Sequence, residues 1–122
     1  MSSASFATTN SAPDRLIAGD YPITTRKVVI DTGVLARGSV LGQITANGKY
    51  ILSLSGASDG SQVPRAILAE AVDATAADVE AIVYESGEFN DTEIVLGTAH
   101  TVASVREGLR DLNIYLRTPV AA

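Results

Sequence analysis

The sequence contains no cysteine and no tryptophan, and its 122 residues include one methionine and one histidine. Without cysteine the chain can form neither a disulfide nor a thiolate metal site. Four tyrosines and two phenylalanines are the only aromatic residues, so Ala, Val, Ile and Leu must fill the interior. A small chain with such a light core often gains stability by associating, which is a first indication of an oligomer.

Basic residues are few: nine Lys and Arg stand against fourteen Asp and Glu, and the net charge is −5. They are spread singly, whereas a nucleic-acid-binding surface needs clustered Lys and Arg. No apolar run approaches the roughly 20 residues of a membrane-spanning helix. The first residues also lack the basic and apolar regions of a signal peptide. We therefore expect neither nucleic acid nor a membrane as a partner.

The length predicts one domain, organised around residues 66–90. Two apolar runs of alternating character, 66–72 and 79–86, flank a small polar segment, which predicts two antiparallel strands joined by a loop. Gly87 follows the second run and can adopt positive φ, which predicts a turn that lets Phe89 fold back onto the sheet. The alternative for this stretch is one helix over residues 75–84.

Further short strands are predicted over residues 27–30, 39–45, 50–54 and 114–118. Asn47 and Gly48 are a strong hairpin signal, because both can take the positive φ of a tight turn, and this turn places Ile44 opposite Ile51. Gly60 marks another turn in the polar loop that follows. An interior glycine, Gly42, indicates a bulge or a close approach of backbone.

One helix is predicted near the C-terminus. Thr98 or Thr101 can cap its start, it runs to about residue 112, and Asn113 can end it in the left-handed conformation. Gly108 weakens the helix, so we expect close packing at that position. The apolar face has helical spacing and consists of Val102, Val105, Leu109 and Leu112.

Residues 1–18 are rich in Ser, Thr and Ala and almost lack a hydrophobic pattern, so they cannot offset their ordering entropy alone. They are either a frayed terminus or an arm that orders on a partner through Phe6, Leu16 and Ile17. We divide the chain into a flexible N-terminal arm, residues 1–18, and a β-rich domain, residues 19–122. The predicted fold class is α+β, mainly β: a small β-barrel or sandwich-like module with one C-terminal helix and an extended arm.

No residue set makes a convincing catalytic site. Residues 42–49 resemble a phosphate-binding loop, but five residues separate the glycines and Tyr50 follows the lysine. His100 lacks a second histidine or a cysteine for a zinc site, and we expect it in the loop before the helix. Two carboxylate pairs flank predicted turns, where solvated carboxylates are ordinary: Asp73 with Asp78, and Glu85 with Glu88. We expect no enzyme activity, no metal and no cofactor.

Six motifs follow one another along the chain: residues 37–42 (RGSVLG), 48–50 (GKY), 58–61 (SDGS), 66–70 (AILAE), 83–90 (VYESGEFN) and 109–116 (LRDLNIYL). Each is weak alone, but their order is specific as a set. Together they resemble the head decoration proteins of tailed bacteriophages, the family that includes the lambda decoration protein. The resemblance covers roughly residues 18–118.

The resemblance implies a structural protein that binds the outer surface of the expanded phage head as trimers and stabilises it against the pressure of packaged DNA. Its partners would be the major capsid protein and copies of itself, and its location the virion, with the host cytoplasm during assembly. In the family the N-terminal arm orders on the capsid. The resemblance thus implies capsid-binding residues at Phe6, Thr8, Thr9, Leu16, Ile17, Tyr21 and Pro22. The alternative is a small-ligand or oligonucleotide-binding β-barrel domain, which a positive groove with stacking aromatics would favour.

Overall fold

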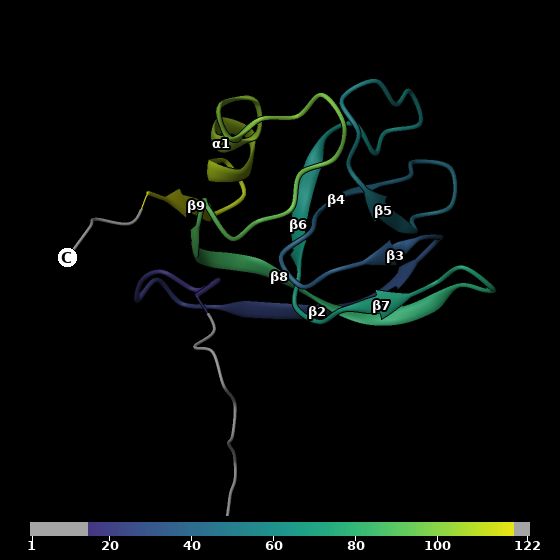
Figure 1. Ribbon diagram of the computed structural model, residues 1–122, viewed down its shortest axis with the longest axis horizontal. Helices are drawn as coiled ribbons and strands as arrows, with labels where there is room; N and C mark the ends of the chain where they lie inside the picture. Colours follow the sequence, from purple (N-terminus) through teal and green to yellow (C-terminus); the bar gives the residue numbers. More distant parts are fainter. Residues whose placement is uncertain (1–14, 119–122) are drawn as a thin grey trace, which may run out of the picture.

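The computed structural model describes residues 15–118. A β-barrel forms its centre, and one helix lies on the outside of the barrel (Figure 1). The strands are β2 (Thr24–Ile30), β3 (Val34–Leu35), β4 (Val40–Gln43), β5 (Tyr50–Leu52), β6 (Pro64–Leu68), β7 (Val72–Asp73), β8 (Val79–Asn90) and β9 (Ile114–Arg117). The helix is α1 (Val102–Arg110). No helix of the described part is long and apolar enough to span a membrane.

Five strands close the barrel in the order β2-β5-β4-β6-β8, because β2 also pairs with β8. The β2–β8 pairing is antiparallel and runs along all of β2, whereas β2 and β5 meet only at Ile30 and Tyr50. β9 extends the sheet in parallel with the end of β8, and β3 and β7 form a separate two-stranded ribbon. The predicted class, a mainly β fold with one C-terminal helix, is confirmed.

Aliphatic side chains and one tyrosine ring fill the barrel interior. They come from alternate positions of the strands, as expected where one face of each strand is buried. The cluster consists of Val28, Ile30, Leu35, Leu41, Tyr50, Ala66, Leu68, Ala74, Ala81 and Val83. The interior of the barrel is thus a packed core.

A second core lies between the outside of the barrel and α1. It consists of Leu16, Val40, Ile67, Tyr84, Phe89, Val105, Leu109, Ile114 and Leu116. Thr101 caps the helix, in a capping box with Ser104, and Asn113 has a positive φ of 66° beyond the helix end, as predicted. Gly108, in contrast, faces open space, so the close packing expected there is wrong.

The hairpin between β4 and β5 has a different register from the predicted one. Ile51 lies opposite Gly42, and not opposite Ile44. Gly48 has a φ of +74°, but Asn47 does not have a positive φ, so the predicted two-residue turn does not form. A longer loop joins the strands instead, and the register shifts by two residues.

The central pair of strands forms as predicted, with Ile67 of β6 opposite Tyr84 of β8. The alternative of a helix over residues 75–84 is wrong. We expected a turn at Gly87, but β8 continues through this residue to Asn90. Gly87 has a φ of +141° and marks the point where β8 begins to pair with β9. Phe89 is fully buried, with its ring centroid 5.2 Å from that of Tyr84.

Candidate functional site

The described chain begins with a segment that is fixed along the end of β8. Ile17 forms an antiparallel bridge with Phe89. The amide of Ala18 donates to the carbonyl of Glu88 over 2.9 Å, and the carbonyl of Leu16 accepts from the amide of Asn90 over 2.7 Å. We call residues 15–23 the arm root, because this segment connects residues 1–14 to the β-rich body.

One carboxylate holds the next part of the arm root. Oε1 of Glu88 accepts a hydrogen bond of 2.9 Å from the amide of Tyr21, and Oε2 accepts one of 2.6 Å from Nε of Arg117. These bonds favour the charged form, so the hydrogen bond from Arg117, followed by that from the Tyr21 amide, lowers the pKa of Glu88. Glu88 thereby links the arm root, β8 and β9.

Two aromatic rings lie beside this carboxylate. The ring of Tyr21 meets the ring of Tyr115 edge to face, with the centroids 4.9 Å apart. The guanidinium carbon of Arg117 lies 5.4 Å from the centroid of Tyr115, within the range of a cation–π contact. The backbone and the ring of Tyr21 are therefore both held against β8 and β9.

Three large apolar residues of the arm root are exposed: Ile17, Tyr21 and Ile23. All three lie along the same short stretch of β8. Ile17 pairs with Phe89, the amide of Tyr21 reaches Glu88, and Ile23 lies against Gly87. We call these three side chains the arm-root surface. Because they are apolar, exposed and fixed in place, they are suited to contact a partner protein.

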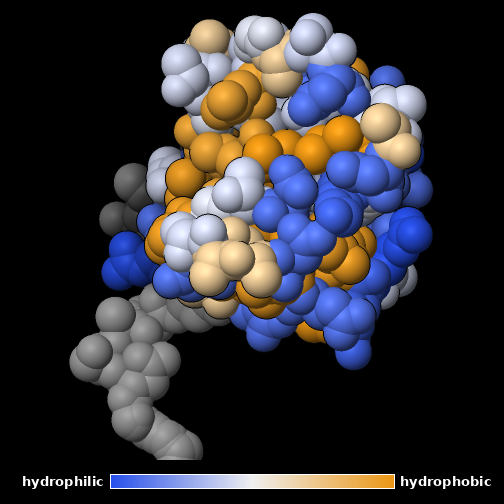
Figure 2. Space-filling view, turned by 90° about the vertical axis from the view of Figure 1, so that its right-hand side faces the viewer, coloured by the Kyte–Doolittle hydropathy of each residue, from blue (hydrophilic) through white to orange (hydrophobic). Residues whose placement is uncertain are grey.

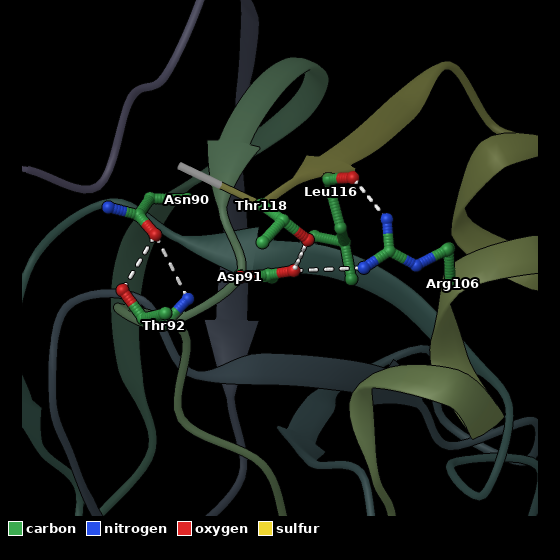
Figure 3. A network of polar contacts seen from close by, with 6 residues as sticks. All are labelled: Asn90, Asp91, Thr92, Arg106, Leu116 and Thr118. Atoms are coloured by element: carbon green, nitrogen blue, oxygen red, sulfur yellow. Dashed lines mark hydrogen bonds and ion pairs between the residues drawn. The ribbon is translucent and has the colours of Figure 1, made fainter. Parts of the chain in front are cut away.

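A polar network stiffens the neighbouring end of the sheet (Figure 3). Oδ2 of Asp91 accepts from Arg106 over 2.9 Å and from the hydroxyl of Thr118 over 2.6 Å. Arg106 also donates to the carbonyl of Leu116 over 2.6 Å. In this way α1, β9 and the end of β8 are tied together where the described part of the chain ends.

The candidate catalytic residues are not brought together. The ring nitrogens of His100 contact the Ser53 hydroxyl at 3.1 Å, the Gln62 carbonyl at 3.2 Å and the Ser104 hydroxyl at 3.1 Å, in the loop before α1 as expected. The four carboxylates each have a separate partner: Asp73 with Thr75, Asp78 with Lys49, Glu85 with Arg26, and Glu88 with Arg117. Within residues 15–118, no three His, Asp or Glu side chains gather as a metal site.

A polar hollow of about 330 Å³ lies between α1 and β9. Its lining residues are Arg106, Glu107, Arg110, Tyr115, Leu116 and Arg117. Each of the three guanidinium groups has a carboxylate partner: Arg106 pairs with Asp91, Arg110 with Glu107, and Arg117 with Glu88. Because these carboxylates balance the positive charges, the hollow is no positive groove for nucleic acid.

Comparison with known families assigns the chain. The model of the bacteriophage lambda head decoration protein D family matches residues 6–115, which is most of the sequence. The chain belongs to this family. Head decoration proteins are structural and non-enzymatic, bind the phage capsid and stabilise the phage head at the virion surface. A search of individually curated proteins finds no match.

The seven residues of this chain that were predicted to bind the phage capsid fall into three groups. Phe6, Thr8 and Thr9 lie outside the described residues, although the family match includes them. Ile17, Tyr21 and Pro22 are exposed on the arm root. Leu16 is only 3% exposed and packs in the core under α1, so its side chain stabilises the body. The role of all seven residues in capsid binding stays a prediction.

The four predicted turn residues, three glycines and one asparagine, lie in three parts of the fold. Asn47 and Gly48 are in the loop between β4 and β5, and Gly60, with a φ of +102°, is in the loop before β6. Gly87 lies within β8. Gly87 lies next to the arm root, since a Cβ added to it would lie 3.2 Å from Cγ1 of Ile23.

Sequence reasoning missed four residues of this site: Ile23, Glu88, Tyr115 and Arg117. Glu88 was considered only with Glu85 as a carboxylate pair. Tyr115 could have been found, because alternation along the last strand places it on the face opposite the buried Ile114. Nothing in the sequence indicates that Glu88 meets Tyr21, 67 residues away.

Proposed function

We propose that the chain binds the outer surface of the expanded phage head as a trimer, through the major capsid protein, and stabilises the head against the pressure of packaged DNA. Attachment uses the N-terminal arm. The observation that supports this most is the arm root, where exposed apolar residues are fixed on β8 directly after residues 6–14, which the family match includes. The chain acts on the virion and is present in the host cytoplasm during assembly.

The arm and the body have different roles in this proposal. Because Leu16 packs in the core and Ala18 is bonded to β8, we assign the contact with the shell mainly to residues 1–14 of the predicted arm, residues 1–18. An extended segment can add as a strand to a sheet of the capsid protein, since main-chain hydrogen bonds give affinity while tolerating varied side chains. Phe6, Thr8 and Thr9 are the arm residues for this contact, and Ile17 and Tyr21 continue it on the arm root.

Three arms on one trimer make the attachment multivalent. Once one arm is bound, the others face a high effective concentration of their sites, so weak single contacts add up to firm binding. A trimer that bridges neighbouring capsid subunits stabilises only the lattice that presents all of its sites at the right spacing. Expanded and unexpanded shells are then distinguished by their different affinities for the trimer.

The alternative function, binding of a small ligand or an oligonucleotide in the barrel, has no supporting observation in the described part of the chain. The barrel interior is a packed core. The arginines beside β9 are balanced by carboxylates.

The function is tested by adding the full chain to purified expanded and unexpanded heads of the phage whose major capsid gene accompanies it. Co-sedimentation should show saturable binding to expanded heads and much weaker binding to unexpanded ones. Bound protein should also raise the temperature at which DNA-filled heads release their DNA. Absence of binding, or equal binding to both kinds of shell, would contradict the proposal.

A further inference from the structure

A polar hollow of about 260 Å³ lies where the five barrel strands meet at one end of the barrel. Each strand contributes one lining residue, and a residue beyond α1 is the sixth: Arg26 of β2, Gln43 of β4, Tyr50 of β5, Arg65 of β6, Glu85 of β8, and Leu112. Because the barrel interior is filled by its core, the hollow is the mouth of the barrel and not a cavity inside it. We call it the mouth hollow. Barrel mouths are common places for binding sites.

The hydroxyl of Tyr50 has unused hydrogen-bonding capacity. Tyr50 is only 4% exposed, and its ring packs in the barrel core among apolar side chains. Within residues 15–118 its hydroxyl has no hydrogen-bond partner. Buried polar groups are nearly always hydrogen-bonded. Since Tyr50 also lines the mouth hollow, a group bound there can supply the partner that its hydroxyl lacks.

The arginines of the mouth hollow also have unused donors. The side chain of Arg65 is exposed and makes neither a hydrogen bond nor an ion pair with any residue of the described chain. Arg26 reaches Glu85 only at 3.5 Å, and both side chains are partly exposed. Exposed ion pairs of this kind are weak. In the hollow between α1 and β9, in contrast, every lining arginine has a carboxylate partner.

Charge indicates which chemical group this site accepts. The mouth hollow is lined by two guanidinium groups and one carboxylate, so one positive charge is left without a counter-charge. A carboxylate carries one negative charge, and its two oxygens match two parallel N–H donors of a guanidinium. A phosphate dianion would bring a second negative charge close to Glu85. The mouth hollow therefore suits a single carboxylate group.

An exposed leucine at the same site favours a protein as the source of this carboxylate. Leu112 is 37% exposed and lines the hollow together with Arg65. Protein interfaces combine apolar contacts with arginine, which is enriched there. Hydropathy alone does not single out one surface, because the face shown in Figure 2 also carries apolar patches between its polar residues. The unused donors beside an exposed leucine distinguish the mouth hollow.

We propose that the mouth hollow is a docking site for an aspartate or glutamate side chain of another protein. Arg65 and Tyr50 bind the carboxylate, Arg26 adds a weaker contact, and Leu112 packs against an apolar neighbour of the acidic residue. This inference does not depend on the proposed function, because none of the lining residues belongs to residues 1–14 or to the arm root.

The test follows binding of small probes to the isotope-labelled full chain by NMR at constant ionic strength. The probes are a blocked tripeptide of glutamate between two leucines, the same peptide with glutamine, and propionate. The glutamate peptide should shift the amides around the mouth hollow saturably, with a dissociation constant in the millimolar range because few atoms are in contact. Propionate should bind more weakly, because it does not reach Leu112, and the glutamine peptide should not bind measurably.

Three substitutions separate binding from folding. Arg65→Gln should weaken binding of the glutamate peptide at least about tenfold, because it removes a charged donor. Arg110→Gln is the matched control, an exposed arginine on α1 that pairs with Glu107, and it should leave the affinity unchanged. Glu85→Gln should tighten binding, because it removes the competing carboxylate from the hollow.

Tyr50→Phe tests the buried hydroxyl. Without peptide this variant should melt no lower than the wild type, since the hydroxyl has no hydrogen bond to lose within the described chain. Its affinity for the glutamate peptide should fall several-fold. A Tyr50→Phe protein that binds the peptide as tightly as the wild type would overturn the assignment of Tyr50 to the site.

Three results would overturn the whole inference: no saturable shift with the glutamate peptide, equal binding of the glutamate and glutamine peptides, or equal affinities of Arg65→Gln and Arg110→Gln. Propionate that binds as tightly as the glutamate peptide would show that the site takes a free acid, and would overturn the docking of a protein.

Discussion

Arg117 on β9 donates a hydrogen bond of 2.6 Å to Glu88 on β8, and the same carboxylate accepts from the amide of Tyr21. Arg117 is 29 residues and Tyr21 is 67 residues from Glu88 in the sequence. One side chain thus joins the arm root to the last strand. This joint holds the arm root against both β8 and β9.

The first prediction concerns this joint. Replacing Glu88 by Gln keeps the shape but removes the charge, so the hydrogen bonds from Arg117 and Tyr21 weaken. At neutral pH Glu88→Gln should melt at a lower temperature than the wild type. Hydrogen exchange should also be faster at the amides of Ala18 and Tyr21.

The pH dependence of the difference in melting temperature between wild type and Glu88→Gln is the control for this prediction. The folded state lowers the pKa of Glu88, so its contribution to stability is complete above the ordinary glutamate pKa of about 4.3 and is lost as the pH falls through the lowered value. The difference in melting temperature between wild type and Glu88→Gln should therefore shrink in acid. A difference that stays constant from neutral pH to about pH 2 would show that the charge of Glu88 does not stabilise the fold.

The second prediction concerns Gly87. Its φ of +141° is unfavourable for other residues, and an added Cβ would lie 3.0 Å from the Phe89 ring. Gly87→Val should lower the free energy of unfolding by more than about 1 kcal/mol. Urea denaturation measures this change, and an unaltered midpoint would show that β8 does not need glycine at its change of partner.

Gly108→Ala is a separate prediction of opposite sign. Gly108 lies inside α1, and an added Cβ would meet no atom within 4 Å. Alanine should raise the free energy of unfolding by about 0.5–1 kcal/mol, because it reduces the entropy that the chain loses in forming the helix. A lower urea midpoint for Gly108→Ala would contradict the open surroundings of this position.

A third comparison separates the two neighbouring apolar residues of the arm root. Leu16 is buried in the core under α1, whereas the side chain of Ile17 is exposed. Leu16→Ala should cost roughly 2–5 kcal/mol of stability, as is typical of buried leucines. Ile17→Ala should change stability by about 0.5 kcal/mol or less. Equal effects of the two substitutions in a thermal melt would mean that the arm root does not pack as described.

The elements that local signals determine were predictable from the sequence. Thr101 as the helix cap, the apolar spacing of Val105 and Leu109, and Asn113 beyond the helix end all depend on neighbouring residues. The alternation around Ile67 and Tyr84 likewise predicted the central strand pair. These signals suffice because each depends only on residues that are close together in the sequence.

The features that depend on distant contacts were not predictable. The close approach of backbone at Gly42 was predicted, and an added Cβ there would lie 1.9 Å from the Ser61 carbonyl oxygen, but the hairpin signal did not indicate which loop approaches β4. The burial of Leu16 depends on α1, which lies some 90 residues later in the sequence. For the same reason, the contact between Glu88 and Arg117 could not be predicted from their positions in the sequence.

The central claim is that residues 1–14 carry affinity for the shell, while the body folds without them. Co-sedimentation with expanded heads should compare the full chain with a variant that lacks residues 1–14. The truncated protein should keep the circular dichroism spectrum and melting temperature of the full chain but lose most of its binding, because the loss is repeated on all three arms. Removal of residues 1–18 should in addition destabilise the body, since it deletes Leu16. If the protein without residues 1–14 binds expanded heads as tightly as the full chain, the attachment lies in the folded body and the claim is wrong.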